Sequence, residues 1–280
     1  MENLIHSGFA LSNQLKRKLK IVYVMDFNWV ASNEFVSGTT TAPTIDSGIR
    51  VFETQIRENY DVAEEEIRRI ISEYLKKYPQ NVPYELDVVE NSRLQIIEKT
   101  IEDEKDVLLL MSNYNSYSGI SNGVVNYPNI MDKVACPVLI VPDDIETVSI
   151  NSFLYATALH AEDLKAIKHL CELMDGADGK KLTVFHNMKE TDSDSKLRWS
   201  GFKALVKESV TGFNVKFEHS NEENVREGLK KYLANESPGV IVLLKEKKGF
   251  FKDLFSSSQT HYVVTHYNKP VLVYHEENLK

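Results

Sequence analysis

Histidine, cysteine and acidic side chains are the groups with which proteins most often hold a metal ion or carry out acid–base and nucleophilic catalysis. The chain has 8 histidines and 2 cysteines. His261 and His266 are five positions apart, whereas two metal ligands on one helix face stand four apart. The acidic run 64–66 is followed by Arg68 and Arg69, which is typical of surface ion pairs on a helix. We therefore name no metal ligand and no catalytic residue.

Recognised catalytic motifs are also missing from the sequence. It contains neither a Gly-x-Ser-x-Gly nucleophile elbow nor a Walker loop. Cys136 and Cys171 each lie in an apolar stretch, and we interpret them as buried reduced thiols. We expect a binding protein rather than an enzyme.

The charge and the apolar patterning exclude two classes of partner. The 33 basic and 41 acidic residues give a net charge of −8, so the chain lacks the positive field that nonspecific nucleic-acid binding requires. The longest apolar runs have five residues, as in Val107–Met111, whereas a membrane span needs about 20. We expect a cytoplasmic protein with no nucleic-acid and no membrane partner.

Strand-like segments recur along the chain at a nearly constant spacing. Pro137–Val141 recurs as Pro270–Tyr274, and Val107–Met111 recurs as Val240–Leu244, both after 133 residues. A repeat of this kind indicates a duplicated structural unit. The predicted domains cover residues 1–145 and 146–280.

Each unit alternates apolar strands with amphipathic helices. In the second half, the apolar run Phe153–Ala158 precedes residues spaced for one helix face, from Leu164 to Met174. The elements predicted after them are Leu182–Phe185, Lys196–Ser209, Asn214–Glu218, Val225–Leu233, Val240–Leu244 and Pro270–Tyr274. This order predicts an α/β fold with a parallel sheet and helices on both faces.

The two closing strands, Pro137–Val141 and Pro270–Val273, the element order and the segment 248–255 resemble the universal stress protein family in its tandem two-domain form. The resemblance covers essentially the whole chain. It implies two Rossmann-like domains, each with a parallel sheet of strand order 3-2-1-4-5. It also implies that final strands pair into an intrachain pseudo-dimer or a homodimer. Many members bind ATP or AMP where the strand order reverses.

The nucleotide motif of this family is degenerate in both halves. Members that bind ATP carry Gly-x-x-Gly and, nine residues later, Gly-Ser or Gly-Thr, because glycine lets the backbone approach the phosphates. Lys245 and Lys248 stand at the two glycine positions of the second half. The candidate nucleotide-binding residues that the resemblance leaves lie in the first half and are Val24, Met25, Ser112, Gly119, Ser121, Gly123 and Val124.

The first strand of the first unit has no counterpart in the sequence. In the family an aspartate at the end of this strand accepts hydrogen bonds from the nucleoside, and in the second half Ala158 holds that position. The equivalent position of the first half would precede Met1, because Leu4 already matches Leu164 in the next helix. The missing strand is the central one. Either the natural chain starts further upstream, which we expect, or another segment, such as part of an insertion, takes its place.

That insertion covers about residues 28–50 and is rich in glycine, threonine and proline. We interpret it as a surface loop before a long helix at 51–77. Trp29 and Phe35 leave open a second role, as anchors of a lid or of a docking arm.

The predicted function is that of a universal stress protein-like binding or regulatory protein, without a competent ATP site in the second domain. One alternative is an ATP- or AMP-binding member that uses the first-half crevice and hydrolyses nucleotide slowly at most. A second alternative is a structural module that acts through dimerisation alone. The resemblance leaves the protein partner unidentified.

Overall fold

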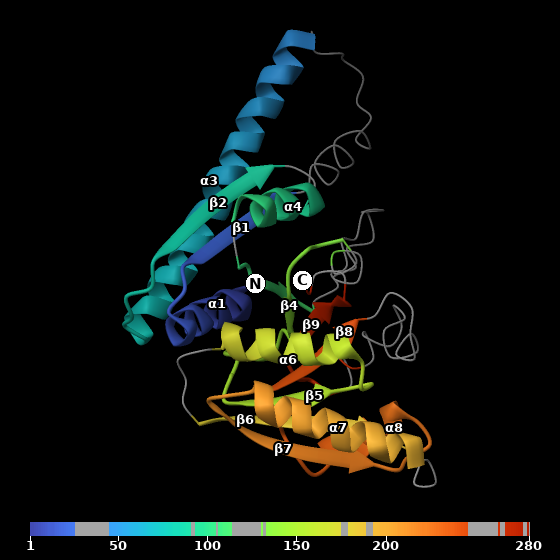
Figure 1. Cartoon of the computed structure of the whole chain (residues 1–280). Helices are drawn as coiled ribbons and strands as arrows, with labels where there is room; N and C mark the ends of the chain where they lie inside the picture. The colour runs from blue at the N-terminus through green and yellow to red at the C-terminus, as the bar shows by residue number, and fades with distance from the viewer. Residues whose placement is uncertain are drawn as a thin grey trace.

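Helices and strands alternate along the computed structural model in Figure 1. The structure describes residues 1–25, 45–90, 93–104, 106–113, 130, 133–174, 179–188, 193–245, 263, 267–276 and 279. The helices are α1 (Glu2–Leu15), α3 (Ile45–Lys77), α4 (Arg93–Asp103), α6 (Ala161–Leu173), α7 (Ser193–Ser209) and α8 (Val225–Leu233). The strands are β1 (Leu19–Met25), β2 (Tyr84–Glu90), β3 (Leu109–Ser112), β4 (Val138–Val141), β5 (Ser152–Ala156), β6 (Lys180–Asn187), β7 (Phe213–Ser220), β8 (Val240–Lys245) and β9 (Val271–His275). The predicted α/β fold is confirmed.

The larger sheet has seven strands in the order β3-β4-β9-β8-β5-β6-β7. From β5 onward, the strands of the second half lie in the predicted order 3-2-1-4-5. All neighbouring pairs are parallel except β4 and β9, which run antiparallel with Leu139 opposite Leu272. This pairing joins the last strand of each half into one sheet.

The remaining strands, β1 and β2, form a separate parallel pair. They correspond to the second and third strands of the first half, while β3 and β4 correspond to its fourth and fifth. Among the described residues, no strand lies between β1 and β3. The described strands of the first half thus fall into two groups, β1 with β2 in the small sheet and β3 with β4 in the large one.

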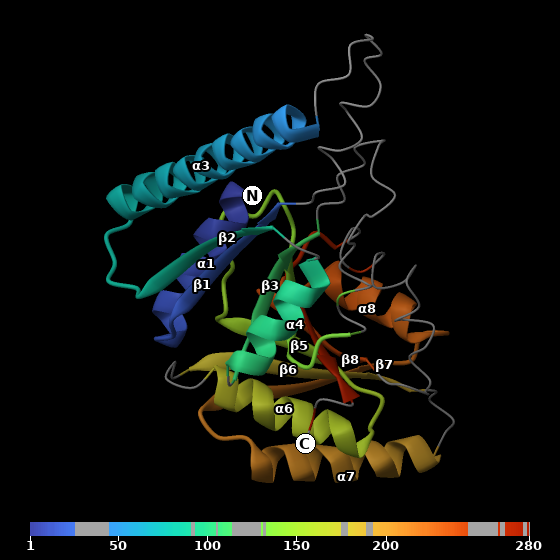
Figure 2. The ribbon, with the colours of Figure 1, turned by 90° about the horizontal axis from the view of Figure 1, so that it is seen from above.

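Helix α1 packs across this division. It contacts β1, β3 and α3. Leu11 belongs to the apolar cluster of the large sheet, whereas Ile5 and Phe9 belong to a second cluster with Ile67 and Ile71 of α3. Figure 2 shows α1 next to β1 and below α3, on the side of the small sheet. One short helix thus contributes side chains to both apolar clusters.

The large sheet is covered on both faces, as the fold class predicts. On one face, α6 and α7 supply Ile167, Leu170 and Phe202 to the core. On the other face, α8 and α4 supply Leu229 and Ile97. The strands between them are apolar on both faces, which is typical of a parallel sheet buried between two layers of helices.

Helix α3 begins earlier than the sequence indicates. It starts at Ile45, so the end of the predicted insertion is helical, while residues 26–44, with Trp29 and Phe35, lie outside the described residues. Gly48 lies in this first part of the helix, but one glycine costs only about 1 kcal/mol, and a helix that continues to Lys77 tolerates this cost. No helix in the described part of the chain is long and apolar enough to cross a membrane.

A close backbone contact at Gly239 holds the start of β8 against the segment before β5. A Cβ atom at this position would lie 2.3 Å from the carbonyl oxygen of Ser149 and 3.2 Å from that of Ser152. We expect Gly239→Ala to lower the free energy of unfolding by about 2 kcal/mol or more, because backbone must move. Urea titration followed by circular dichroism measures this change.

Gly201→Ala is the matched control. Gly201 is exposed on α7, and a Cβ atom there would meet nothing within 4 Å. We expect this substitution to stabilise the protein by about 0.5–1 kcal/mol, because alanine is the better helix former. Equal effects of the two substitutions would contradict the close contact at Gly239.

Candidate functional site

The strand order of the large sheet reverses at β5, which lies between β6 and β8. In open α/β sheets, ligands bind outside the carboxyl ends of the strands at such a reversal. The four residues 157–160 follow β5 at this edge and lead into α6. The groups that line the edge decide what can bind there.

Asp163, in the first turn of α6, is the centre of a hydrogen-bond network at this edge. Its Oδ1 accepts a bond of 2.8 Å from the Tyr155 hydroxyl, and its Oδ2 accepts one of 2.7 Å from the Thr157 hydroxyl. The backbone N–H groups of Ala158 and His160 also donate to Oδ2, at 3.1 and 3.0 Å. One side chain therefore ties the end of β5, the loop and the start of α6 together.

The network is shielded from water. The side chains of Asp163 and Thr157 are 1% and 2% exposed. Burial raises the pKa of Asp163, because loss of water disfavours the ionised carboxyl, while the bonds from Thr157, Tyr155 and His160 act in the opposite direction. N–H groups at a helix N-terminus are the groups that bind a ligand phosphate in this type of fold. Here, those of Ala158 and His160 bond an internal carboxyl group.

His186, on β6, extends the network to the next helix. Its Nδ1 donates to the carbonyl oxygen of Thr157 at 2.9 Å, and its ring lies 5.5 Å from the ring of Trp199. Burial lowers the pKa of His186, and the positive charge of Arg198 and the ring of His219 lower it further. The bond to Thr157 and the carboxyl group of Asp163 act in the opposite direction. Burial is the largest of these effects, so the pKa of His186 is lowered and its neutral ring is favoured.

The carboxyl ends of β6 and β7 are joined in a similar way. The Ser220 hydroxyl donates to Oδ1 of Asn187 at 2.5 Å, and Nδ2 of Asn187 donates to the carbonyl oxygen of Glu222 at 3.1 Å. Gly228 of α8 packs so closely that a Cβ atom would lie 2.3 Å from Oγ of Ser220. The polar groups at this end of the sheet bond one another.

The first half has a smaller polar cluster at the end of β3. The Ser112 hydroxyl donates to the carboxylate of Asp143, and the N–H of Asp143 donates to Oδ1 of Asn113 at 3.0 Å. Nδ2 of Asn3, at the start of α1, donates to the carbonyl oxygen of Asp143 at 2.5 Å. The cluster thus links the end of a strand to the beginning of a helix.

The structure divides the residues predicted from the sequence. Ser112 lies in the polar cluster at the end of β3, whereas Val24 and Met25 end β1 in the other sheet. Ala158 offers only its backbone N–H to the network, as its side chain predicts. The predicted residues that lie outside the described part of the chain are Gly119, Ser121, Gly123 and Val124.

Sequence reasoning missed the network around Asp163. An acidic residue in the first turn of a helix is an ordinary complement to the helix dipole, so nothing singled it out. A signal is present in the repeat, because the spacing that matches Leu4 with Leu164 also matches Asn3 with Asp163. Both residues bond a segment at the carboxyl edge of a sheet.

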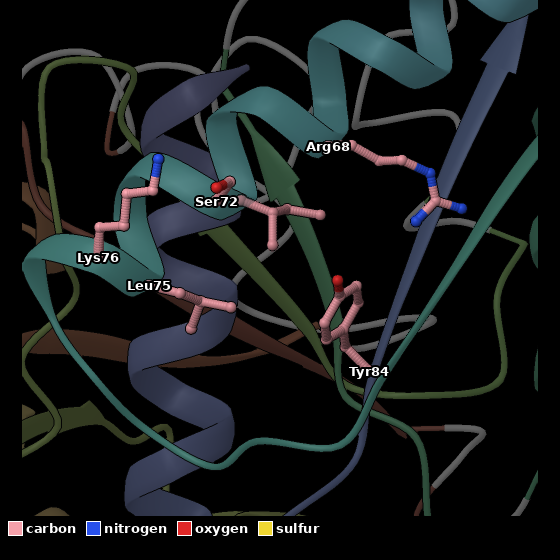
Figure 3. Close-up of a pocket in the computed structure, with 6 residues that line it drawn as sticks. Arg68, Ser72, Leu75, Lys76 and Tyr84 are labelled. Carbon is pink, nitrogen blue, oxygen red and sulfur yellow. The ribbon is translucent and has the colours of Figure 1, made fainter.

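A surface groove of about 370 Å³ lies elsewhere, between α3 and β2. Figure 3 shows Arg68, Ser72, Leu75 and Lys76 of α3 on one side of it and Tyr84 on the other. Tyr84 is the first residue of β2, so the groove lies at the amino end of that strand. Arg68 forms an ion pair of 2.6 Å with Glu64. The groove is therefore distinct from the strand ends at which this fold binds ligands.

Both cysteines have free thiol groups. Burial raises the pKa of Cys136 to about 11 and that of Cys171 to about 12, so both thiols stay protonated near neutral pH. Among the described residues, no three histidine, cysteine or acidic side chains are placed to hold a metal ion together.

Comparison with known proteins identifies the fold. No family model and no curated protein matches the sequence. The structure is similar to that of a universal stress protein from Archaeoglobus fulgidus, with a TM-score of 0.57, 16% identity and coverage of 95% of this chain and 90% of the other. A universal stress protein structure from Pseudomonas aeruginosa matches with a TM-score of 0.46 and 12% identity over 95% of this chain and 97% of the other. The chain has the universal stress protein fold.

Asp163→Ala tests the network at the end of β5. The substitution removes the acceptor for two buried hydroxyls and two partly buried N–H groups. We expect the free energy of unfolding to fall by about 3 kcal/mol or more, because each stranded polar group costs about 1–3 kcal/mol. Asp163→Asn keeps an oxygen acceptor and should lose less than half as much. Equal losses in urea titrations of the two variants would show that hydrogen bonding at this position is unimportant.

His186 makes stability depend on pH. Because its pKa is lowered by folding, the folded state binds this proton less well than the unfolded state, whose ordinary value is 6.5. Its contribution to stability is complete above pH 6.5 and is lost as the pH falls through the lower pKa of the folded state. We expect the difference in urea midpoint between pH 7.5 and pH 5 to shrink in His186→Gln, which retains a donor for Thr157. An unchanged difference would show that His186 is not a source of the pH dependence of stability.

Proposed function

We propose that this chain is a universal stress protein-like protein of the tandem two-domain form, with domains at 1–145 and 146–280, and that it acts by binding or regulation in a stress response rather than by catalysis. The similarity of fold supports the family, and the antiparallel pairing of β4 with β9 supports a pseudo-dimer within one chain. The partner is then a protein, with neither a membrane nor a nucleic acid involved, and the location cytoplasmic.

The second domain, in this proposal, has no competent ATP site. The observation that carries it is the bonding of Asp163 to the N–H groups of Ala158 and His160. A nucleotide at this edge would have to compete for N–H groups that already donate to a carboxyl group with four donors. Lys245, at the end of β8, stands where close approach of a phosphate to the backbone requires glycine.

The first-half crevice supports one alternative, an ATP- or AMP-binding protein. The hydroxyl of Ser112 and the amides of Asn113 and Asn3 meet there beside the start of α1. Hydroxyl and amide groups next to a helix N-terminus suit a phosphate ligand. In this alternative, Asp143 would have to release Ser112 when the nucleotide binds.

Native mass spectrometry tests the two candidates on the full chain. The protein is purified without nucleotide and then measured with added ATP, AMP or ADP. We expect no retained nucleotide and no saturable binding, because the second-half donors are occupied. The same spectra give the number of chains in the particle, so a dimer that binds no nucleotide would favour the alternative of a purely structural dimerisation module.

One bound nucleotide per chain would overturn the proposal that this protein binds no nucleotide. Ser112→Ala, Gly119→Val and Gly123→Val then locate the site: loss of binding in these variants selects the first-half crevice. Loss in Lys245→Ala, with binding intact in Ser112→Ala, would instead show that the second half is competent.

A further inference from the structure

Helix α7 carries apolar side chains on both of its faces. Trp199, Phe202 and Val206 are buried in the core of the large sheet. Leu197 and Leu205 lie on the outer face and are 73% and 49% exposed. Surface helices usually carry polar residues on the face that is turned away from the core. Figure 2 shows α7 at the lower edge of the molecule, so this outer face is available to a partner.

We propose that the outer face of α7 binds the protein partner, and that the partner presents an acidic amphipathic helix to it. This inference rests on the proposed function, in which the chain acts by binding another protein. It adds the place of that binding and the chemistry of the partner.

The shape of the outer face suits a second helix. Gly201 and Ala204 follow Leu197 by four and seven residues, so they lie on the same side of α7, and both are exposed. A Cβ atom at Gly201 would meet nothing within 4 Å. Leu197 and Leu205 are about 12 Å apart along the helix axis. The face is therefore lower in its middle than at the two leucines, and a large apolar side chain of another helix can pack between them.

A row of lysines borders this face. Lys196, Lys203 and Lys207 are spaced by seven and four residues, which places them on one side of the helix. The ammonium groups of Lys203 and Lys207 lie 5.5 and 5.8 Å from the ring centres of Trp199 and Phe217. Among the described residues, no carboxylate lies within ion-pair distance of any of the three lysines. The row can therefore receive the carboxylates of a partner.

The other helices use their surface cations differently. Arg69 of α3 pairs with Glu66 and Glu73, and Lys231 of α8 pairs with Glu222. A row of lysines that has no such acids is unusual in a chain with a net charge of −8. Complementary charges at the rim of an interface select the partner and speed its association, while the apolar contacts supply most of the affinity. The lysines thus predict an acidic partner, and the leucines predict an apolar stripe on it.

Two acids on the outer face argue against other occupants. Asp194 and Glu208 lie near its two ends and are exposed. Two copies of α7 paired antiparallel around Gly201 would bring each Asp194 close to Glu208 of the other copy, and these like charges repel. A membrane surface would meet the same acids together with only two large apolar side chains, whereas membrane-surface helices bury a continuous apolar face.

Two designed peptides test this surface on the full chain. Each is an alanine-rich helix of about 20 residues with a leucine stripe, and the two differ only in the row beside the stripe, which is glutamate in one and lysine in the other. Fluorescence anisotropy of the labelled peptides measures binding. We expect the glutamate peptide to bind saturably and at least about tenfold more tightly than the lysine peptide, and added salt should weaken its binding.

Gly201→Leu tests whether the middle of the face is the contact. The new side chain fills the low part of the face, and the fold tolerates it because nothing lies within 4 Å of a Cβ atom there. We expect it to weaken binding of the glutamate peptide by at least about tenfold. Val62→Leu is the matched control, because Val62 is 66% exposed on α3. It should leave binding unchanged.

A charge exchange tests the row of lysines. Lys196→Glu combined with Lys207→Glu should reverse the preference, so that the lysine peptide binds more tightly than the glutamate peptide. Lys76→Glu combined with Lys99→Glu makes the same change in net charge at exposed positions of α3 and α4. This control should keep the original preference. Equal effects of the two double variants would show that net charge alone acts, and would overturn the proposal.

Other results would also overturn the acidic helix as the partner. They are the absence of saturable binding, equal binding of the two peptides, and binding that Gly201→Leu leaves unchanged. Light scattering and sedimentation with phosphatidylserine vesicles test the other occupants. A dimer, or vesicle binding, that Gly201→Leu abolishes would assign the face to a second copy or to a membrane. A nucleotide retained in native mass spectrometry would contradict the proposed function and leave the peptide result unaffected, so the two proposals can fail separately.

Discussion

Backbone pairing along parallel strands is the constraint on which this structure depends. Each strand inside a sheet must bond both neighbours, because buried N–H and C=O groups without partners are costly. In the large sheet, β5 meets this demand with β6 on one side and β8 on the other, and the β4–β9 pair extends it across the two halves. In the first half, the described strands belong to two sheets: β1 pairs with β2 in the small one, and β3 pairs with β4 in the large one.

Side chains of α1 pack against both the small and the large sheet and so connect them. Phe9 and Leu11 are fully buried, one in the cluster with α3 and the other in the core of the large sheet. Burying a side chain of this size contributes about 1.5–3 kcal/mol. Packing of α1 against both sheets therefore holds the small sheet beside the large one, together with ion pairs such as that of Arg17 with Asp106.

In the second half, N–H groups of the loop after β5 also need hydrogen-bond acceptors. Its donors are not left for a ligand, because the carboxyl group of Asp163 accepts from them. This arrangement stabilises the strand–helix connection and occupies the groups with which the fold would hold a phosphate. The same bonds thus support the fold and argue against nucleotide binding, whereas in the first half Ser112 and Asn113 both bond Asp143.

The sequence by itself determined the α/β class and the order of the elements. These follow from local patterns: apolar runs such as Val240–Leu244, helical periodicity and the repeated Pro-Val-Leu strand report what each segment buries. Only the tertiary structure showed that the helix after the insertion begins at Ile45, that α1 serves two cores, and that Asp163 closes the edge at β5. Hydrogen bonds and packing between distant segments leave no periodic trace in the sequence, so their partners are fixed only when the chain folds.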